Sequence, residues 1–151
     1  MRAIQLTNVK QFMADILMKE AFDGFCVSEA VVRMACTYKI DGRINKSFFT
    51  KEEQEELGDR EYLFWKDVKP FVFSVIKGSK TPDTMKIVLN LPETELERFG
   101  FNEVTGMCIN FRFETGSLTA VTGIVKNTFT TDKTPDNVWD DYVEKLLVDY
   151  I

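Results

Sequence analysis

The segment from Met107 to Ile124 restricts the fold more than any other, because it pairs well with itself around a turn at Thr115-Gly116. With Glu114 opposite Ser117, one face of this hairpin is almost wholly apolar and the other is largely polar. The apolar face holds Met107, Ile109, Phe111, Phe113, Leu118, Ala120, Thr122 and Ile124. Antiparallel strands with one buried side show this alternation. The sequence therefore predicts an antiparallel sheet that is covered on one face.

Apolar periodicity and end signals predict the elements around this hairpin. Strands are expected at residues 3–6, 25–40, 43–49 and 85–91, and helices at residues 9–17, 51–57, 64–76 and 135–150. The order is then β-α-β-β-α-α-β-β-β-α. We therefore predict the α+β class, with residues 1–151 forming a single domain. Its sheet is mainly antiparallel, and its helices pack on one face.

Two of these segments leave alternatives open. Asp41-Gly42 predicts a hairpin turn. A three-residue loop there is favoured over a two-residue loop, because Cys36 then lies on an apolar face as a packing residue. Residues 64–76 keep helical spacing, although Pro70 requires a start near Asp67 or a kink. A strand at residues 71–76 is the alternative, but a helix accounts for more of the apolar positions.

The absence of histidine excludes imidazole bases, Ser-His-Asp and Cys-His nucleophiles, and every metal site that contains His. Cys26, Cys36 and Cys108 form no C-x-x-C pair, so we expect no disulfide framework, no structural zinc and no cofactor. These thiols suit a reducing compartment, and the start of the chain lacks an apolar signal segment. No apolar run approaches 18 residues. We therefore expect a cytoplasmic protein without a membrane partner.

Paired carboxylates occur at Glu52-Glu53 and Asp140-Asp141. Both pairs are expected on solvent-exposed helix faces, so no catalytic residue is assigned and an enzyme is not favoured. The specific function is unknown from the sequence, and a non-catalytic binding or interaction module is the preferred interpretation. A homo-oligomer is open, because the apolar stripe of the last helix can cover either its own sheet or a second copy.

Candidate binding residues fall into two groups. The net charge is −5, but residues 66–86 are rich in lysine, and a loop is expected at residues 77–83. Candidate contacts to an anion or a partner are Lys66, Lys69, Lys77 and Lys80, and nucleic acid is expected only through this region. The alternative is an apolar small-molecule pocket beneath the last helix. Its candidate polar contacts are Glu29, Asn110 and Arg112.

Two stretches carry a resemblance to known proteins. They are Phe25–Phe49, with Ile40-Asp41-Gly42-Arg43, and Trp65-Lys66-Asp67-Val68-Lys69-Pro70 running on to Ile76-Lys77-Gly78-Ser79-Lys80-Thr81-Pro82. They resemble a family of small proteins of unknown function from gut clostridia and related Firmicutes. The resemblance covers most of the chain and implies no activity, ligand or catalytic residue.

The order of elements also resembles, more weakly, one domain of a DNA sliding clamp. Helices in those rings present Lys and Arg side chains to the duplex. That resemblance implies contacts from Lys10 and Lys19 on the first helix, together with Lys66, Lys69 and Lys77 on the third.

Overall fold

A six-stranded antiparallel sheet forms the body of the structure, a computed structural model that describes residues 1–78 and 80–151. The strands are β1 (Ala3–Leu6), β2 (Cys26–Arg33), β3 (Thr37–Asp41), β4 (Thr84–Asn90), β5 (Val104–Glu114) and β6 (Ser117–Lys126). The helices are α1 (Val9–Met18), α2 (Lys51–Leu57), α3 (Trp65–Ile76), α4 (Glu93–Leu96) and α5 (Thr134–Leu146). This confirms the predicted class and order, to which α4 adds one turn. Of the loop predicted at residues 77–83, Ser79 lies outside the described residues.

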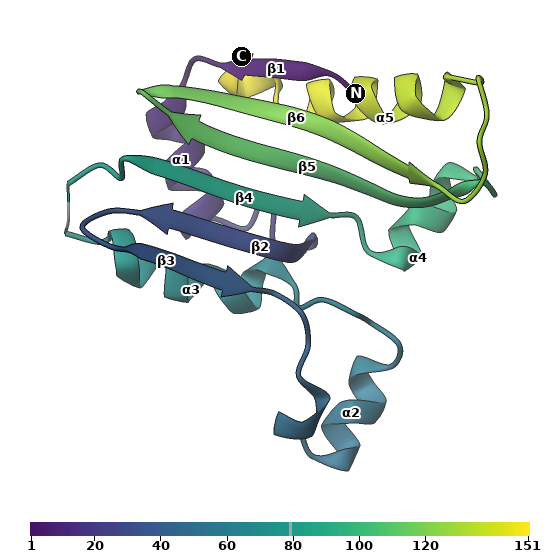
Figure 1. The fold of residues 1–151 in the computed structure, drawn as a ribbon, viewed down its shortest axis with the longest axis horizontal. Helices are drawn as coiled ribbons and strands as arrows, with labels where there is room; N and C mark the ends of the chain where they lie inside the picture. Colours follow the sequence, from purple (N-terminus) through teal and green to yellow (C-terminus); the bar gives the residue numbers. More distant parts are fainter. Residues whose placement is uncertain (79) are drawn as a thin grey trace.

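The strand order across the sheet is β1-β6-β5-β4-β2-β3 (Figure 1). The long hairpin of β5 and β6 has the predicted register, with Glu114 opposite Ser117 and Met107 opposite Ile124. Its two turn residues, Thr115 and Gly116, have φ angles of 49° and 77°. Two positive φ angles in succession are what a tight two-residue hairpin turn requires.

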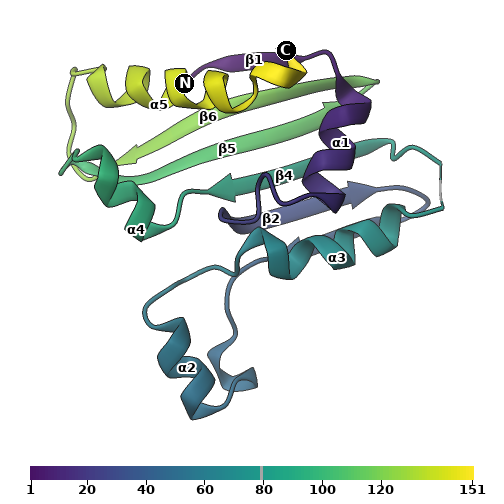
Figure 2. The same ribbon diagram turned by 180° about the vertical axis from the view of Figure 1, so that it is seen from behind.

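One face of the sheet is covered by three helices: α5 lies along the β1–β6 side, α3 lies along the β2 side, and α1 crosses the strands between them (Figure 2). The covered face is apolar: Phe111 at its centre is fully buried, and its ring centroid lies 4.8 Å from that of Phe12 and 5.8 Å from that of Phe22. The opposite face has no covering helix in the described part of the chain. Antiparallel sheets tolerate this arrangement because alternate side chains can be polar.

Helix α5 packs on its own sheet, which is one of the two partners that the sequence left open for its apolar stripe. Trp139, Val143 and Leu147 are buried, and Trp139 Nε1 donates a hydrogen bond to the Cys108 carbonyl oxygen at 3.0 Å. The chain end is also fixed, because the Tyr150 carbonyl oxygen accepts hydrogen bonds from the amides of Thr7 and Asn8. A helix of this length is marginal alone, so packing stabilises it.

The predicted strand at residues 25–40 is wrong in one respect, because the chain reverses in its middle. β2 ends at Arg33, residues 34–36 turn, and β3 returns antiparallel with Val32 opposite Tyr38. The turn Met34-Ala35-Cys36 contains none of the residues that commonly mark turns, so the pattern predicts a continuous strand. Cys36 is exposed at this turn and is not a packing residue of an apolar face.

The Asp41-Gly42 hairpin is also wrong, because residues 43–49 form no strand: Arg43 makes an isolated bridge to Tyr62, and Lys46–Phe48 form a short 3-10 helix. Gly42 has a different role. The chain leaves β3 here and passes over the start of β2, where a Cβ atom on Gly42 would lie 1.8 Å from the Val27 carbonyl oxygen. The Gly42 amide donates to the Ser28 carbonyl oxygen, and its carbonyl accepts from the Leu63 amide. Glycine is needed here for close backbone contact and not for a turn.

The segment at residues 64–76 is helical, and the strand alternative for residues 71–76 is excluded. α3 begins at Trp65 and keeps Pro70 in its interior. Two hydrogen bonds fix the early start, because the Trp65 amide donates to the Phe25 carbonyl oxygen and its Nε1 donates to that of Ile16 at 2.7 Å. These tertiary contacts offset the hydrogen bond that a proline inside a helix removes.

A half-buried ion pair at the start of α5 predicts loss of stability in acid. Lys126 Nζ lies 2.6 Å from Asp136 Oδ2, and this hydrogen bond lowers the pKa of Asp136 below its ordinary value. A carboxyl whose pKa is depressed by folding stabilises the fold above its unfolded pKa of about 3.9. That stability is lost as the pH falls through the folded pKa. Asp136→Asn should therefore lower the urea midpoint at pH 7 and leave it nearly unchanged at pH 2.

The matched control is Glu55→Gln, which removes one exposed carboxylate from α2. Its urea midpoint should follow that of the parent protein at every pH between 2 and 7. A loss for Asp136→Asn that is the same at pH 2 and pH 7 would contradict a contribution from the ionised pair.

Candidate functional site

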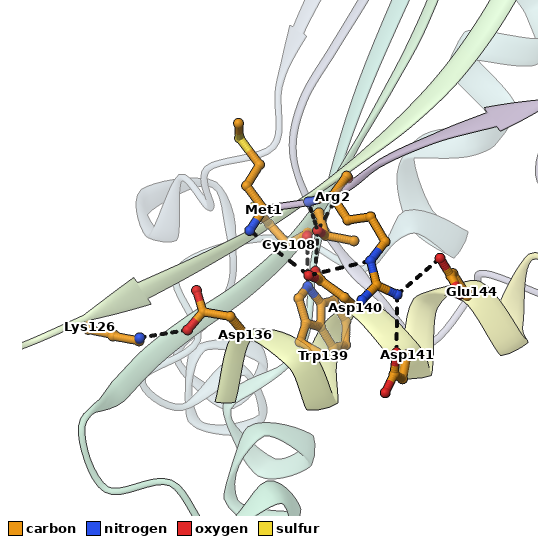
Figure 3. Close-up of polar contacts among 10 residues, drawn as sticks. Met1, Arg2, Cys108, Lys126, Asp136, Trp139, Asp140, Asp141 and Glu144 are labelled. Atoms are coloured by element: carbon orange, nitrogen blue, oxygen red, sulfur yellow. Dashed lines mark hydrogen bonds and ion pairs between the residues drawn. The ribbon is translucent and has the colours of Figure 1, made fainter. Parts of the chain in front are cut away.

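A polar cluster joins the first residues of the chain to α5 (Figure 3). The Thr122 hydroxyl donates to Asp140 Oδ1 at 2.5 Å, and the Arg2 Nε atom lies 3.8 Å from Asp140 Oδ2. The Arg2 Nη1 atom also lies 3.1 Å from Asp141 Oδ1 and 3.0 Å from Glu144 Oε1. The prediction that both members of the pair Asp140-Asp141 are exposed is wrong for Asp140, which is buried.

These contacts give the cluster a structural role. Each buried oxygen of Asp140 already faces a donor or a cation, and the carboxylate points between β6 and α5. A buried charge is tolerated only when it is paired and hydrogen-bonded in this way. The cluster therefore holds the start of β1 against α5, and it leaves no carboxylate pair facing a cleft.

The four candidate lysines have different surroundings. Lys69 pairs with Asp23 at 2.5 Å and donates to the Lys19 carbonyl oxygen, so it links α3 to the end of α1. Lys66 and Lys77 lie at opposite ends of α3, eleven residues and about 16 Å apart. Lys80 lies beyond the helix, on the wall of a groove next to α1.

The three candidate polar contacts all lie on the sheet face that has no helix. Val88 of β4 pairs with Glu29 of β2 on one side and with Asn110 of β5 on the other. Arg112 lies two residues further along β5, where it pairs with Lys86. The Glu29 carboxylate is paired with Lys86 at 3.4 Å and with Lys39 at 3.7 Å. These residues are therefore brought together, but on the opposite face from α5.

The space beneath α5 is filled by side chains. Trp139, Val143 and Leu147 contact the sheet with at most 1% of their surfaces exposed. The two grooves that we describe on this structure are lined by other elements. The small-molecule interpretation therefore needs a location other than the covered face.

The larger groove has a volume of about 630 Å³ and lies where the chain crosses from β3 to α3. Its floor is the end of the uncovered sheet face, where Cys26 and Asn90 are directly opposite each other on β2 and β4. One wall is the segment 59–64 and the other is the segment 91–96, which includes α4. We call this the Arg60 groove; its principal lining residues are Cys26, Arg60, Phe64, Asn90, Leu96 and Met107.

Two hydrogen-bond donors in the Arg60 groove have no partner. The Nε atom of Arg60 and the Nδ2 atom of Asn90 are both buried, and neither contacts an acceptor in the described part of the chain. The Arg60 guanidinium lies 4.0 Å from the centroid of the Phe64 ring, which holds it against the wall. Buried polar atoms in proteins are nearly always hydrogen-bonded, so unpartnered donors in a concave site indicate a place for a ligand acceptor.

The charges around these donors are mixed. Lys66 Nζ lies 5.6 Å from the centroid of the same Phe64 ring, while Asp59, Glu61 and Glu93 also line the groove. Glu61 is paired with Arg43 at 3.6 Å. The site therefore suits a small ligand with an oxygen acceptor, and it does not suit a polyanion such as a nucleic-acid backbone.

The thiol in the groove is not set up as a nucleophile. Burial raises the pKa of Cys26, so the thiolate is scarce at neutral pH. Burial likewise raises the pKa of Cys108, which lies on the other side of Asn90 in the same row. The two cysteines are two strands apart, about 10 Å, which exceeds the span of a disulfide.

Sequence reasoning did not identify Arg60 or Asn90. Asn90 has a weak signal, since it is a polar residue at the end of the alternating β4 segment, on the same face as Val88. Arg60 has none, because it follows Gly58 in a loop between two short helices. The structure brings them together by placing Phe64 beside Cys26 in an isolated antiparallel bridge.

Residues 1–78 and 80–151 provide no support for a metal site or for a membrane-spanning helix. Those residues contain no group of three or more Asp, Glu or Cys side chains arranged to hold a metal ion. No helix formed by them is both long and apolar enough to cross a bilayer.

Comparisons with known proteins identify a family but no activity. Residues 15–150 match the model of a family of unknown function, DUF5721. The expected resemblance is confirmed at that level. No curated protein matches the chain, and no solved structure matches it.

Proposed function

We propose that this chain, which belongs to the family of unknown function DUF5721, is a non-catalytic module that binds a small organic ligand in the Arg60 groove. The observation that carries the proposal is that two residues lining the same groove, Arg60 and Asn90, each have a buried donor, Nε and Nδ2, without an acceptor. A carboxylate or carbonyl oxygen is the group that would satisfy them.

The remainder of the groove defines the rest of the ligand. Leu96 offers apolar contact, and the Phe64 ring offers a flat surface for an aromatic or planar group. The volume of about 630 Å³ falls in the usual range for small-molecule sites. We therefore propose a ligand with a planar body and one acceptor group. A reducing cytoplasm is the proposed compartment, because all three cysteines are free.

Titration with three probes of equal size tests the chemistry of the site. Phenylacetate carries an anionic acceptor, phenylacetamide a neutral acceptor, and phenethylamine a cation without an acceptor. Ligand-observed NMR should detect binding of the first two with a Kd of about 1 mM or below, or roughly −4 kcal/mol, and should not detect the third. Binding of the amine alone would contradict the proposal.

Two variants of the same residue type separate this groove from the rest of the sheet. Asn90→Asp keeps the side-chain shape but replaces the donor with a carboxylate, and it should abolish binding of phenylacetate. Asn110→Asp makes the same change one strand away, outside the groove, and should retain binding. Equal binding by both variants would place the site elsewhere.

A further inference from the structure

A second groove lies at the opposite end of the sheet from the Arg60 groove and shares none of its lining residues. It has a volume of about 490 Å³ and is enclosed by α1, the end of α3 and the sheet, where α1 crosses toward α3 (Figure 2). We call it the Lys80 groove. Its apolar lining includes Val9, Met13, Ile76, Pro82, Met85 and Phe113.

The apolar lining of the Lys80 groove is only partly covered by the protein itself. Met85 and Phe113 form a buried floor, whereas Val9, Met13 and Ile76 on the walls are half-buried. Covering those walls with an apolar ligand removes their surface from water, which is favourable in proportion to the area covered. Two of the lining residues are methionines, whose flexible side chains adapt to the shape of a bound chain.

The charge of this groove contrasts with that of the whole molecule. The protein has a net charge of −5. Yet Lys10 and Lys80 line the groove, and none of the described lining residues is acidic. Both lysines are exposed, and neither pairs with a carboxylate within residues 1–78 and 80–151. An apolar groove lined by two exposed lysines, with no acidic residue in its described lining, is complementary to a ligand with an apolar chain and a negative head.

We infer that the Lys80 groove binds a single-chain amphipathic carboxylate, of the fatty-acid class. The hydrocarbon chain of the ligand lies along Met13, Met85 and Phe113, and its carboxylate contacts Lys10 and Lys80. The volume of the groove is typical of sites that hold one small molecule. This inference uses different residues from the Arg60 groove and stands or fails independently of it.

Titration calorimetry with three ten-carbon amphiphiles tests the head-group requirement. Decanoate, decanol and decyltrimethylammonium share a chain length and differ in head-group charge, and each is used below its critical micelle concentration. Decanoate should bind at one site per protein molecule, and decanol should bind at least threefold more weakly. Decyltrimethylammonium should produce no detectable heat of binding. Binding of the cation as tight as that of decanoate would overturn the inference, as would no binding of decanoate at 1 mM.

Charge reversal at the two lysines tests the location. The double variant Lys10→Glu, Lys80→Glu should bind decanoate at least tenfold more weakly than the parent. The control is the pair Lys66→Glu, Lys77→Glu, which changes the net charge equally at residues outside the lining. This control should stay within twofold of the parent. Equal losses in the two double variants would show that decanoate responds only to overall charge, which overturns the site.

A third variant tests whether the apolar wall of the Lys80 groove contributes to decanoate binding. Met13→Gln places an amide in the wall of the groove without a change in charge, and it should weaken decanoate binding several-fold. Far-ultraviolet circular dichroism checks that this variant is folded. Asn90→Asp should bind decanoate as the parent does, because Asn90 lies in the Arg60 groove. Loss of decanoate binding in Asn90→Asp would move the carboxylate site to that groove.

Discussion

Replacement of Gly42 with alanine should remove most or all of the stability of the protein. The new Cβ atom would lie 1.8 Å from the Val27 carbonyl oxygen and 2.8 Å from its carbonyl carbon. Both are backbone atoms of β2, so no side chain can move aside. Relief requires separation of the crossing strands, which breaks the hydrogen bonds from Gly42 to Ser28 and from Leu63 to Gly42. We expect a loss above about 4 kcal/mol, against a typical total of about 5–15 kcal/mol.

The matched control is Gly24→Ala. A Cβ atom on Gly24 would have no neighbour within 4 Å, and its φ angle lies outside the left-handed region. Alanine there should leave the free energy of unfolding unchanged or raise it by up to about 1 kcal/mol, because it restricts the unfolded chain, so the urea midpoint should not fall. Similar urea midpoints for the two variants would contradict the close crossing of residue 42 over Val27.

Gly42 also shows where local sequence patterns are ambiguous. Asp-Gly is a strong turn signal, but glycine serves equally where two backbones approach closely. The choice between these roles depends on Val27, which is 15 residues away in the sequence and directly beneath Gly42 in the fold. The true reversal at residues 34–36 has no Gly, Pro, Asn or Asp, so the sequence contains no marker for it.

The register of the β5–β6 hairpin could be predicted to the residue because it depends on neighbouring residues and not on distant ones. Its register depends on two local features, an alternation that extends over both strands and a turn at Thr115-Gly116. A shift of one residue would expose every apolar side chain, so only one register is compatible with burial. The terminal helix was predictable in the same way, because its apolar stripe and the Pro135 near its start are both local.

The candidate sites were less accessible to sequence reasoning because their parts are distant in the chain. Arg60 and Asn90 meet only after segment 59–64 docks against the end of β2. Asp140 lies next to the stripe residue Trp139, and helical periodicity alone does not reveal that Thr122 and Arg2 converge on it. Lys80 was selected for its charge, but the apolar groove beside it is formed by α1, the end of α3, β4 and β5.

Phe111→Ala should be the most destabilising truncation in the β5–β6 hairpin. Phe111 is fully buried at the centre of the covered face, where its ring contacts those of Phe12 and Phe22. Removal of the ring leaves a cavity between the sheet and α1 that a packed core fills only in part. Truncations of this kind cost about 3–5 kcal/mol. The measurement is the urea midpoint, with the m-value used to check that unfolding remains two-state.

The adjacent residue supplies the control for the face assignment. Arg112 follows Phe111 in β5, points to the opposite face and is exposed. Arg112→Ala should therefore change stability by no more than about 0.5 kcal/mol, as is usual for surface substitutions. If Arg112→Ala were as costly as Phe111→Ala, the face without a helix would be buried against something in solution. Sedimentation of the parent protein would then show a dimer, because purified protein contains no other chain to cover that face.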